Sequence, residues 1–529
     1  MNRNRNEAYV GIDVGTSSVK VGLLAGDSYH VVTRPAGLVV SRAGGAEQDA
    51  RGLWATVAGA IREVVHAAGD DVHVRAVGLS GHSPSLVAAG PSGDPLTPVI
   101  TWMDRRPLLD GRGNPAPLDG SADYRAQGPS FEATARWLAS LRALQAESGW
   151  VLLQPKDFIA LRLTGRACID SSSASCFSWY DPARGWDVRG GHDVAAFLPS
   201  VVHPWEACGT VTHEAARETG LPAGIPVAPG GIDAVMEALG AGILGPGAAC
   251  DATGTSTCVS LVCPAEEGQG SCMCHVAPGR FLRVAPVSYT GGSLKWALSV
   301  LFPAEASATH DWRELVTEAV AASRPGASGL LFIPHLVGQR SPKANPHARG
   351  AFVGLEPKHT RADMLRAVLE GCSYAVRESL EAMSCHQMTA EMRAVGSGAR
   401  HDPWLQIKAD VLGIPYKGMS ITEGAVLGAI VLAGHCCGDF ASLEEATRRL
   451  VSWRRVFDPC DDVRRVYDVM YEAYREASIG LERAQEVLTG TRTDACWEEA
   501  SAPETGPGGL QAHALMRDTE DETCQETSS

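Results

Sequence analysis

A single carboxylate and a glycine-hydroxyl turn stand about twenty residues apart in the middle of the chain. Asp233 follows the pair Gly230-Gly231 and begins an amphipathic run, a position where backbone N–H groups can hold a carboxylate in its charged form. The turn is Gly254-Thr255-Ser256, whose glycine lets the backbone approach a phosphate while hydroxyls and N–H groups bond its oxygens. Together these features predict phosphoryl transfer to a hydroxyl, although each one alone is also typical of an ordinary turn.

A similar turn occurs near the N-terminus. Residues 9–24 are expected to form a strand, a tight turn at Gly15-Thr16-Ser17 and a second strand, with Asp13 just before the turn. An aspartate, Asp251, also precedes the Gly254 turn, and a β-rich strand follows it. Two domains of related plan, each with a hydroxyl-rich turn, could therefore grip a polyphosphate between them. Chance recurrence is the alternative, because the chain contains 57 glycines.

A third polar group follows a predicted strand at residues 74–79. The loop Ser80–Ser85 leaves this buried strand, and α/β sheets bind ligands at such strand ends. His82 could bond a sugar hydroxyl, and Trp102 and Asp104, in the segment PVITWMDRR, could contact the same ligand. The alternative is a loop histidine whose hydrogen bonds stay within the protein, beside an ordinary core tryptophan.

Apolar periodicity, capping residues and glycine stops indicate the elements that position these groups. Helices are expected over residues 49–68, 130–146, 152–165, 361–383, 402–412, 423–433, 442–451 and 463–487, and another carries Lys295 after Gly291-Gly292. The helix at 423–433 consists of small residues, so it could pack backbone against backbone. Residues 330–355 begin as a strand and continue as an irregular loop, which is either functional or a solvated excursion.

Length and charge restrict the class of protein. A chain of 529 residues is too long for one ordinary core, so two or more domains are expected. The formal net charge of -15 argues against nucleic acid or an anionic membrane as a partner. The sequence has no uninterrupted apolar span of membrane length and no apolar signal core before its first strand. It predicts a soluble, cytoplasmic protein.

The 15 cysteines are scattered, and many lie within apolar runs, as reduced core thiols do. The best metal candidates are Cys272-x-Cys274-His275 and Cys436-Cys437. Neither has zinc-type spacing with a second half-site. Core thiols are therefore expected here, rather than structural zinc.

Taken in order, the motifs resemble those of the FGGY carbohydrate kinase family, and most nearly its xylulokinase-like members. The resemblance extends over roughly residues 8–480. The motifs that carry it are VGIDVGTSSVKVGLL, GLSGHSPSLV with PVITWMDRR, PKDFIALRLTG, PVAPGGIDAVMEALGAGI, DATGTSTCVS, LFIPHLVGQRSPKANPHARGAFVGL, and AVGSGARHDPWLQIKADVLG with EGAVLGAIVLAG.

The resemblance implies an α/β protein with two ribonuclease-H-like domains of the actin, Hsp70 and sugar kinase superfamily, and with ATP in a cleft between them. It implies an N-terminal sugar-binding domain at residues 8–245 and a C-terminal nucleotide-binding domain at 246–488. Residues 489–529 fall outside the resemblance and are predicted to form an acidic, disordered tail, because they are rich in Thr, Glu, Pro and Gly.

By motif position, Asp233 matches the catalytic base of the family and a substrate contact, and Asp13 matches the aspartate that positions Mg²⁺ with the ATP phosphates. The sugar contacts correspond to the loop residues His82 and Ser83, with Trp102 and Asp104. The nucleotide and phosphate set that the resemblance implies is Asp13, Gly15, Thr16, Ser17, Lys20, Gly254, Thr255, Gly291, Lys295, Gly398 and Ala399. A small-molecule sugar or polyol is the implied partner, and a homodimer is left open.

Two departures concern the acceptor. Xylulokinases typically carry Gln-Met-His-Gly after Ser-Gly, and glycerol kinases an Arg-Glu pair, where this chain has His82-Ser83-Pro84-Ser85. The residue after the predicted base is Ala234, where Asn or Gln is usual. The spare hydroxyls of the loop suit a polyol or a ketose. Pentulose, pentitol, hexulose and cyclitol all stay open as acceptors.

Three functions are compared. ATP-dependent phosphorylation of a sugar or polyol, possibly related to D-xylulose, is favoured by the ordered motifs and by the presence of both carboxylates. A non-catalytic regulatory member that binds sugar or nucleotide is the alternative that the altered loop raises. An actin-like or Hsp70-like ATPase with an assembly or chaperone role is disfavoured by the long segment 80–106 on the sugar side.

Overall fold

The computed structural model describes residues 6–41, 44–69, 71–108, 130–187, 194–263, 271–303, 311–383 and 386–490. The predicted acidic tail lies outside these ranges from residue 491 onward. No helix among the described residues combines the length and the apolar character needed to cross a membrane.

The first large sheet is built from the N-terminal part of the chain. Its strand order is β14-β15-β6-β1-β2-β3, with β1, β2 and β3 antiparallel in sequence and β6 and β15 parallel to β1. The strands are β1 (Glu7–Val14), β2 (Ser18–Ala25), β3 (Ser28–Pro35), β6 (His73–Gly81), β14 (Gly209–Thr210) and β15 (Pro226–Ile232).

The second large sheet repeats this plan. Its order is β18-β19-β17-β16-β22-β23-β24, in which β16, β17 and β19 are antiparallel and β22 and β23 run parallel to β16. The strands are β16 (Ala248–Thr253), β17 (Thr257–Cys263), β18 (Ser271–Cys274), β19 (Phe281–Val287), β22 (Glu391–Val395), β23 (Tyr416–Met419) and β24 (Trp453–Phe457). The predicted fold of two related α/β domains is confirmed.

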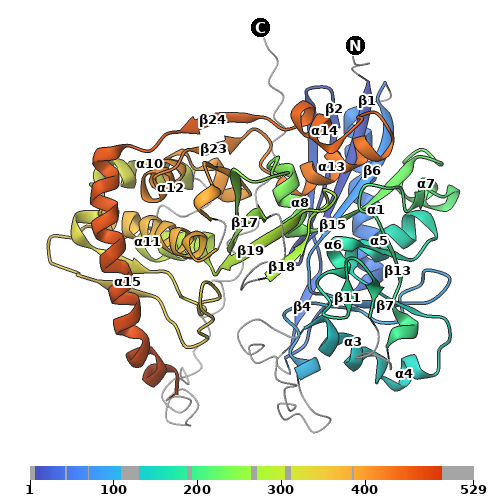
Figure 1. Cartoon of the computed structure of the whole chain (residues 1–529), viewed down its shortest axis with the longest axis horizontal. Helices are drawn as coiled ribbons and strands as arrows, with labels where there is room; N and C mark the ends of the chain where they lie inside the picture. Colours follow the sequence, from blue (N-terminus) through green and yellow to red (C-terminus); the bar gives the residue numbers. More distant parts are fainter. Residues whose placement is uncertain are drawn as a thin grey trace, which may run out of the picture.

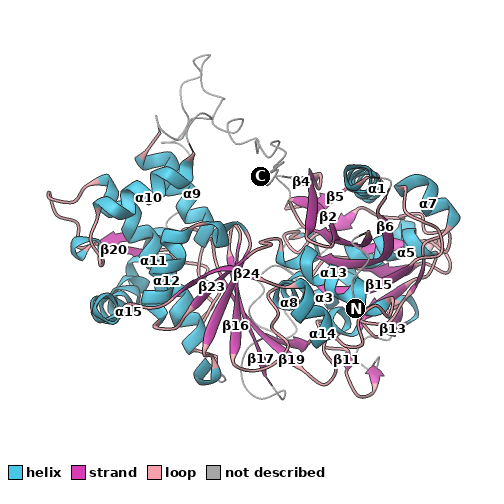
Figure 2. Ribbon diagram, turned by 90° about the horizontal axis from the view of Figure 1, so that it is seen from above, coloured by secondary structure: helices cyan, strands magenta, loops and turns pink. Residues whose placement is uncertain are grey.

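Helices surround the two sheets, which form separate lobes in Figure 1 and again in the view from above in Figure 2. The first lobe carries α1 (Ala50–Ala68), α3 (Phe131–Ala139), α4 (Arg142–Gln145), α5 (Pro155–Thr164), α6 (Ser171–Ala174) and α7 (His213–Thr219). The second carries α9 (Thr290–Leu301), α10 (Trp312–Ala322), α11 (Arg361–Glu381), α12 (Asp402–Leu412) and α15 (Asp461–Gly490). Between the lobes in both views lies α8 (Asp233–Gly240).

Small sheets of two or three short strands complete the part of the chain that the structure describes. They are β4 (Leu38–Val40), β5 (Ala46–Gln48) and β8 (Val99–Ile100); β7 (Val87–Ala89) with β9 (Val151–Leu153); β10 (Cys168–Asp170) with β13 (Ser200–Val202); β11 (Tyr180–Asp181) with β12 (Gly185–Trp186); and β20 (Leu331–Ile333) with β21 (Ala351–Val353). Single 3-10 turns lie at Arg106–Leu108, Ala195–Phe197, Ala327–Gly329, His386–Met388 and Ser397–Arg400.

Two predicted helices differ from the structure. The helix expected at 152–165 begins only at Pro155, because proline disfavours a helical residue before it and Leu152 and Leu153 pair with β7 instead. The helix expected at 130–146 is two helices, α3 and α4, which are separated at Ser140 and Leu141. Gly165 does end α5 in the left-handed conformation, as predicted.

The helix α13 (Gly424–Cys436) follows β23 in the sequence but packs against the first sheet and α8, and α14 (Leu443–Leu450) follows it. Its contacts are backbone to backbone, as its small residues predicted. A β-carbon at Gly78 would lie 2.0 Å from the Ala429 carbonyl oxygen, and one at Gly11 would lie 2.3 Å from that of Val426. On α13 itself, a β-carbon at Gly428 would lie 2.1 Å from the Met236 carbonyl oxygen. Only glycine permits these approaches.

This contact predicts opposite effects for one substitution at two helical glycines. Gly428→Ala should lower the free energy of unfolding by about 1–3 kcal/mol, because the new methyl group has no room. Gly480→Ala, in α15, meets nothing within 4 Å and should raise it by about 0.5–1 kcal/mol. Denaturant titration of both variants measures the difference. Stabilisation by both would contradict the proposed role of the contact.

Candidate functional site

Three parallel strands of the first sheet place polar groups in one row. Asp13 on β1 is the register partner of Ser80 on β6, and Ser80 is the register partner of Gly231 on β15. The Ser80 hydroxyl donates to Asp13 Oδ1 over 2.9 Å. Asp233 follows two residues after Gly231, as the first residue of α8. The carboxylates of Asp13 and Asp233 therefore occupy the same end of the sheet.

Gly230 determines how β15 reaches that end. Its φ is 68°, and a β-carbon there would lie 1.6 Å from the Leu79 carbonyl oxygen, so no other residue fits. The register between β15 and β6 shifts between Ala228 and Gly231. Just before this irregularity, the Pro229 carbonyl oxygen accepts a hydrogen bond of 3.2 Å from Lys156 Nζ.

Lys156 is itself held by two acids. Its ammonium lies 2.5 Å from Asp157 Oδ1 and 2.6 Å from Asp170 Oδ2, and all three side chains are fully buried. A buried ion pair holds its geometry because neither charge can be left unpaired there without a large penalty. This triad therefore holds Pro229, and with it the approach of β15 to Asp233.

The charge of Asp233 differs from the sequence prediction. Burial, with repulsion from Asp13, raises the pKa of Asp233 to about 7, against the opposing effects of the Ala234 N–H group and Arg340. Its Oδ1 accepts one backbone hydrogen bond, from Ala234 N at 2.8 Å. One such bond offsets burial beside another acid only in part, so the helix N–H groups favour the charged form less than the sequence position predicts.

Two further acids share this region. Burial raises the pKa of Asp13, while the opposite charge of Lys20, its register partner on β2, and the Ser80 hydroxyl act against the rise. Glu237 lies one helical turn after Asp233 on the same face of α8. Burial and the charges of Asp233 and Asp13 raise the pKa of Glu237 well above its usual range. This end of the sheet holds more acid than its cations neutralise.

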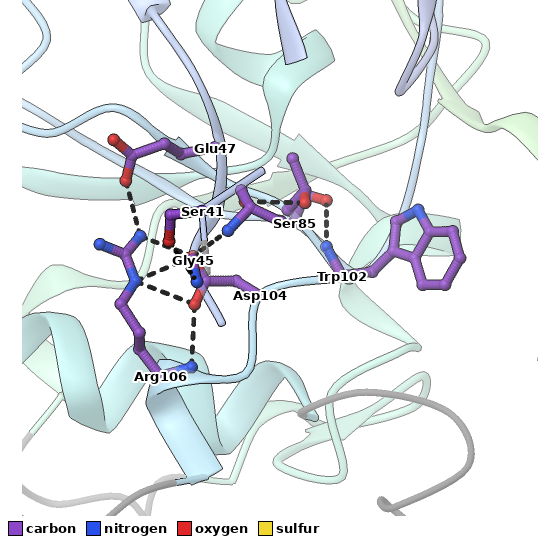
Figure 3. A network of polar contacts seen from close by, with 9 residues as sticks. Ser41, Gly45, Glu47, Ser85, Trp102, Asp104 and Arg106 are labelled. Carbon is purple, nitrogen blue, oxygen red and sulfur yellow. Dashed lines mark hydrogen bonds and ion pairs between the residues drawn. The ribbon is translucent and has the colours of Figure 1, made fainter. Parts of the chain in front are cut away.

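Around His82, hydrogen bonds form a closed ring with Gln48, Ser85, Trp102 and Thr16. The ring nitrogens of His82 lie 3.2 Å from Gln48 Oε1 and 2.9 Å from Ser85 Oγ. Ser85 Oγ accepts from the Trp102 backbone N–H at 3.1 Å, as Figure 3 shows. The Trp102 indole donates to Thr16 Oγ1 at 3.1 Å, and Gln48 Nε2 donates to the Thr16 carbonyl oxygen at 2.9 Å.

The partners fix the hydrogen-bond direction around this ring. Because Gln48 Nε2 is a donor, its Oε1 accepts from His82 Nε2–H, which leaves His82 Nδ1 to accept from the Ser85 hydroxyl. Burial lowers the pKa of His82 to about 3, which agrees with a neutral ring. Both ring nitrogens are thus hydrogen-bonded within the protein, which is the alternative that the sequence left open beside a sugar contact. Its contact with a sugar stays a prediction.

Asp104 is also fully engaged. Its carboxylate accepts from the Ala46 N–H group at 2.9 Å and from the backbone and guanidinium of Arg106, which in turn contacts Glu47 (Figure 3). The side chain is completely buried. Asp104 therefore ties the Trp102 segment to β5. The Ser83 hydroxyl takes no part in the ring and contacts the Cys176 thiol instead.

The second glycine turn is the meeting point of the predicted nucleotide residues. The amide of Gly292 donates to the Thr255 carbonyl oxygen at 2.9 Å, and a β-carbon at Gly291 would lie 2.0 Å from the Gly254 carbonyl oxygen. A β-carbon at Gly398 would lie 2.5 Å from Thr253 Cγ2. Gly254 and Thr255 themselves are exposed. The turn, the start of α9 and the loop after β22 therefore form one surface.

The remaining predicted positions lie around these two surfaces. Ala399 is buried next to Gly398, and its carbonyl oxygen accepts from Arg454 at 2.9 Å. Gly15 closes the first turn by donating to the Ser18 carbonyl oxygen at 3.0 Å. Ser17 and Lys295 are exposed.

Asp251, before the second turn, differs from Asp13 in position and in surroundings. It stands three residues before Gly254, whereas Asp13 stands two residues before Gly15, so the two side chains leave corresponding strands on opposite faces. Lys408 Nζ lies 2.8 Å from Asp251 Oδ2, and the Tyr416 hydroxyl donates to the same oxygen at 3.2 Å. Thr253 Oγ1 lies 2.5 Å from Asp251 Oδ1. Asp251 is completely buried and neutralised, whereas Asp13 remains partly accessible without a direct ion pair among the described residues. Of the two aspartates, only Asp13 can bind a ligand cation.

Sequence reasoning missed several of these partners. Gln48, Lys156 and Lys408 act through hydrogen bonds to residues far away in the chain, and no local pattern marks them. Arg340 lies in the irregular segment 334–350, which was singled out as a loop, and its guanidinium stands 5.8 Å from the Trp102 ring centroid. An arginine in a loop rich in Gly and Pro was the only signal for it.

Comparison with known proteins gives a consistent result. The profile of the "FGGY family of carbohydrate kinases, N-terminal domain" matches residues 8–109 and 133–240, and that of the C-terminal domain matches residues 252–437. A xylulose kinase of Staphylococcus epidermidis is 28% identical over 88% of this chain and 96% of its own length. An erythritol kinase of Brucella abortus is 25% identical over 90% of this chain and 97% of its own. The crystal structure of xylulose kinase from Rhodospirillum rubrum is 26% identical, with a TM-score of 0.76 over 90% of this chain and 100% of that one.

The ring around His82 predicts that Ser85 stabilises the fold. Ser85→Ala leaves both His82 Nδ1 and the Trp102 N–H group without their partner, so the free energy of unfolding should fall by about 1–3 kcal/mol. Ser92→Ala is the control, because Ser92 is exposed and bonds only the Asp94 carboxylate in a surface turn. Denaturant titration compares the two. Equal free energies of unfolding for the two variants would show that the ring does not contribute to stability.

Proposed function

Because this chain belongs to the FGGY family of carbohydrate kinases, we propose that it transfers the γ-phosphoryl group of ATP to a ketose or polyol, with Asp233 as the general base. The observation that carries the proposal is that Asp233, at the start of α8, shares one end of the first sheet with Asp13 and Ser80, where the loop Ser80–Ser85 begins. The family uses ATP to phosphorylate sugars, and the site supplies a candidate for each part of that reaction.

The base is suited to its task by its surroundings. A group that accepts a proton from a hydroxyl works best when its pKa lies near the working pH. Burial beside Asp13 raises the pKa of Asp233 to about 7, which is in that range. The proton of the attacking hydroxyl passes to Asp233, and the hydroxyl oxygen forms its new bond to phosphorus as the bond from phosphorus to ADP breaks.

The phosphates are assigned to the two glycine turns. The Gly254 N–H group closes the second turn by donating to the Ser256 carbonyl oxygen, so exposed Thr255, with its hydroxyl, is the candidate donor there. Thr16 lies in the matching turn of the first hairpin. Donors placed where charge develops stabilise a phosphoryl transfer without reorganising. Closure of the lobes over the acceptor would keep water away from the phosphoryl group.

Mg²⁺ fits the acidic end of the first sheet. Within the described ranges, no three His, Cys, Asp or Glu side chains stand close enough to hold a metal ion by themselves. That agrees with a cation held by one carboxylate, water and substrate phosphates, as Mg²⁺ usually is. Asp13 is the residue that would hold it, because Asp251 is already neutralised by Lys408. When bound, Mg²⁺ would neutralise phosphate charge.

The acceptor is proposed from two facts. The names of the relatives refer to xylulose and erythritol, a ketose and a polyol. The loop Ser80–Ser85 carries no charge, because His82 is neutral, which suits an uncharged polyhydroxy compound, and the Ser83 hydroxyl is the candidate contact in it. A pentulose such as D-xylulose is the first candidate.

Turnover on a panel of acceptors tests the function. Release of ADP from MgATP should depend on one of D-xylulose, D-ribulose, xylitol, erythritol or glycerol, and should stop when Mg²⁺ is chelated. Asp233→Asn should lower kcat by about 10²–10⁴-fold, the usual contribution of a general base, while MgATP binding is retained. Asp94→Asn, in an exposed turn, should act as the wild type. Acceptor binding without turnover on any compound would favour a regulatory protein instead.

The pH dependence gives a second check. Asp233 accepts a proton only when it is ionised, so kcat/KM for the acceptor should fall about tenfold per pH unit below its pKa, near 7, and level off above it. If the carboxylate instead had the ordinary pKa of 3.8, kcat/KM would not change between pH 9 and pH 5. Initial rates from pH 5 to 9 distinguish the two. A flat profile over that range would exclude Asp233 as the titrating base.

A further inference from the structure

Arg340 crosses from one lobe to the other. It belongs to the irregular segment between β20 and β21, in the lobe of the second sheet. Its guanidinium carbon lies 5.8 Å from the centroid of the Trp102 ring, in the lobe of the first sheet. The Trp102 indole in turn donates to Thr16 Oγ1. A cation from the second lobe is thus stacked next to the first glycine turn.

The Asp233 carboxylate and the Cys258 sulfur are further neighbours of Arg340. Burial lowers the pKa of the Arg340 guanidinium, Asp233 opposes that change, and Arg340 in turn opposes the rise in the pKa of Asp233. Cys258 is the register partner of Ala252 across the hairpin that ends in the Gly254 turn. The guanidinium therefore lies near the predicted base and near the hairpin of the second turn.

The Arg340 guanidinium has a hydrogen-bond donor that no described residue accepts. Its Nε is buried and has no hydrogen-bond partner among the described residues, where Arg340 also forms no ion pair within 4.0 Å. Arg349, in the same segment as Arg340, has hydrogen-bond partners. Its Nη1 donates to the carbonyl oxygens of Pro346 and Ala348 at 2.8 and 2.7 Å. A buried donor without a partner is unfavourable, and a bound ligand that accepts its hydrogen bond would remove that penalty.

We propose that Arg340 is a catalytic residue that binds the phosphoryl group during transfer. This inference rests on the proposed function. As the acceptor oxygen bonds to phosphorus and the bond to ADP breaks, negative charge spreads over the three equatorial oxygens, while the hydroxyl proton goes to Asp233. A guanidinium near the base and the second turn can bind those oxygens, and the face of the Trp102 ring orients it. A neutral sugar hydroxyl offers no partner of comparable charge.

Arg340→Gln tests the proposal, with Arg349→Gln as the matched control on the same loop. With the acceptor of the panel that gives the highest turnover, Arg340→Gln should lower kcat by about 10²–10³-fold. This is the usual effect of losing one hydrogen-bond donor to the charge that develops in the transition state. The dissociation constant of that acceptor, measured by calorimetry without nucleotide, should change less than threefold. Arg349→Gln should match the wild type in both measurements.

A transition-state mimic gives a readout without turnover. Aluminium fluoride should tighten MgADP binding in the wild type when the acceptor is present, and Arg340→Gln should lose this gain. Arg340→Lys keeps the charge without the planar stack, so it should recover part of kcat, and it serves as the test if the glutamine variant fails to fold.

Two results would overturn the inference. One is a kcat for both Arg340 variants equal to that of the wild type. The other is an acceptor dissociation constant that rises while kcat is kept, which would make Arg340 a sugar contact. A wild-type protein that turns over no acceptor of the panel would instead refute the proposed function, and this inference with it.

Discussion

The close approach of α13 to the first sheet and to α8 is the constraint on which the site depends. Gly11 and Gly78 lie two residues before Asp13 and Ser80 on their strands, so each glycine faces the same side as its polar neighbour. The helix covers the glycines, and the polar residues emerge just beyond it. Gly428 brings the same helix against the backbone of α8, which begins with Asp233. One backbone contact therefore sets the relative positions of β1, β6 and α8.

The two halves share a sheet plan but divide the chemistry. Asp251 stands one residue further from its turn than Asp13 does, so it leaves its strand on the opposite face. Lys408 and Tyr416 hold Asp251 in a buried network, whereas Asp13 has only Ser80 as a direct hydrogen-bond partner among the described residues. Of the two carboxylates, Asp13 is therefore the one without a neutralising ion pair within the described ranges.

Much of this arrangement was predictable, because glycine turns, caps and periodicity are local. The two hairpins, the helix α11 and the small-residue helix α13 follow from neighbouring residues alone. The start of α5 did not, because pairing of Leu152 and Leu153 with β7 outweighs their helical pattern. The charge of Asp233 could not be predicted either, since it depends on burial and on Asp13, which is distant in the sequence.

The ring that joins Gln48, His82, Ser85, Trp102 and Thr16 also bears on how this scaffold can change over time. Its members satisfy one another, so the loop Ser80–Ser85 is held by bonds within the protein. Two of the partners lie outside the loop, Gln48 in β5 and Thr16 in the first glycine turn. Substitutions that spare the contacts of His82 and Ser85 should therefore be tolerated one at a time, whereas replacement of the whole loop would also disturb the turn beside Asp13.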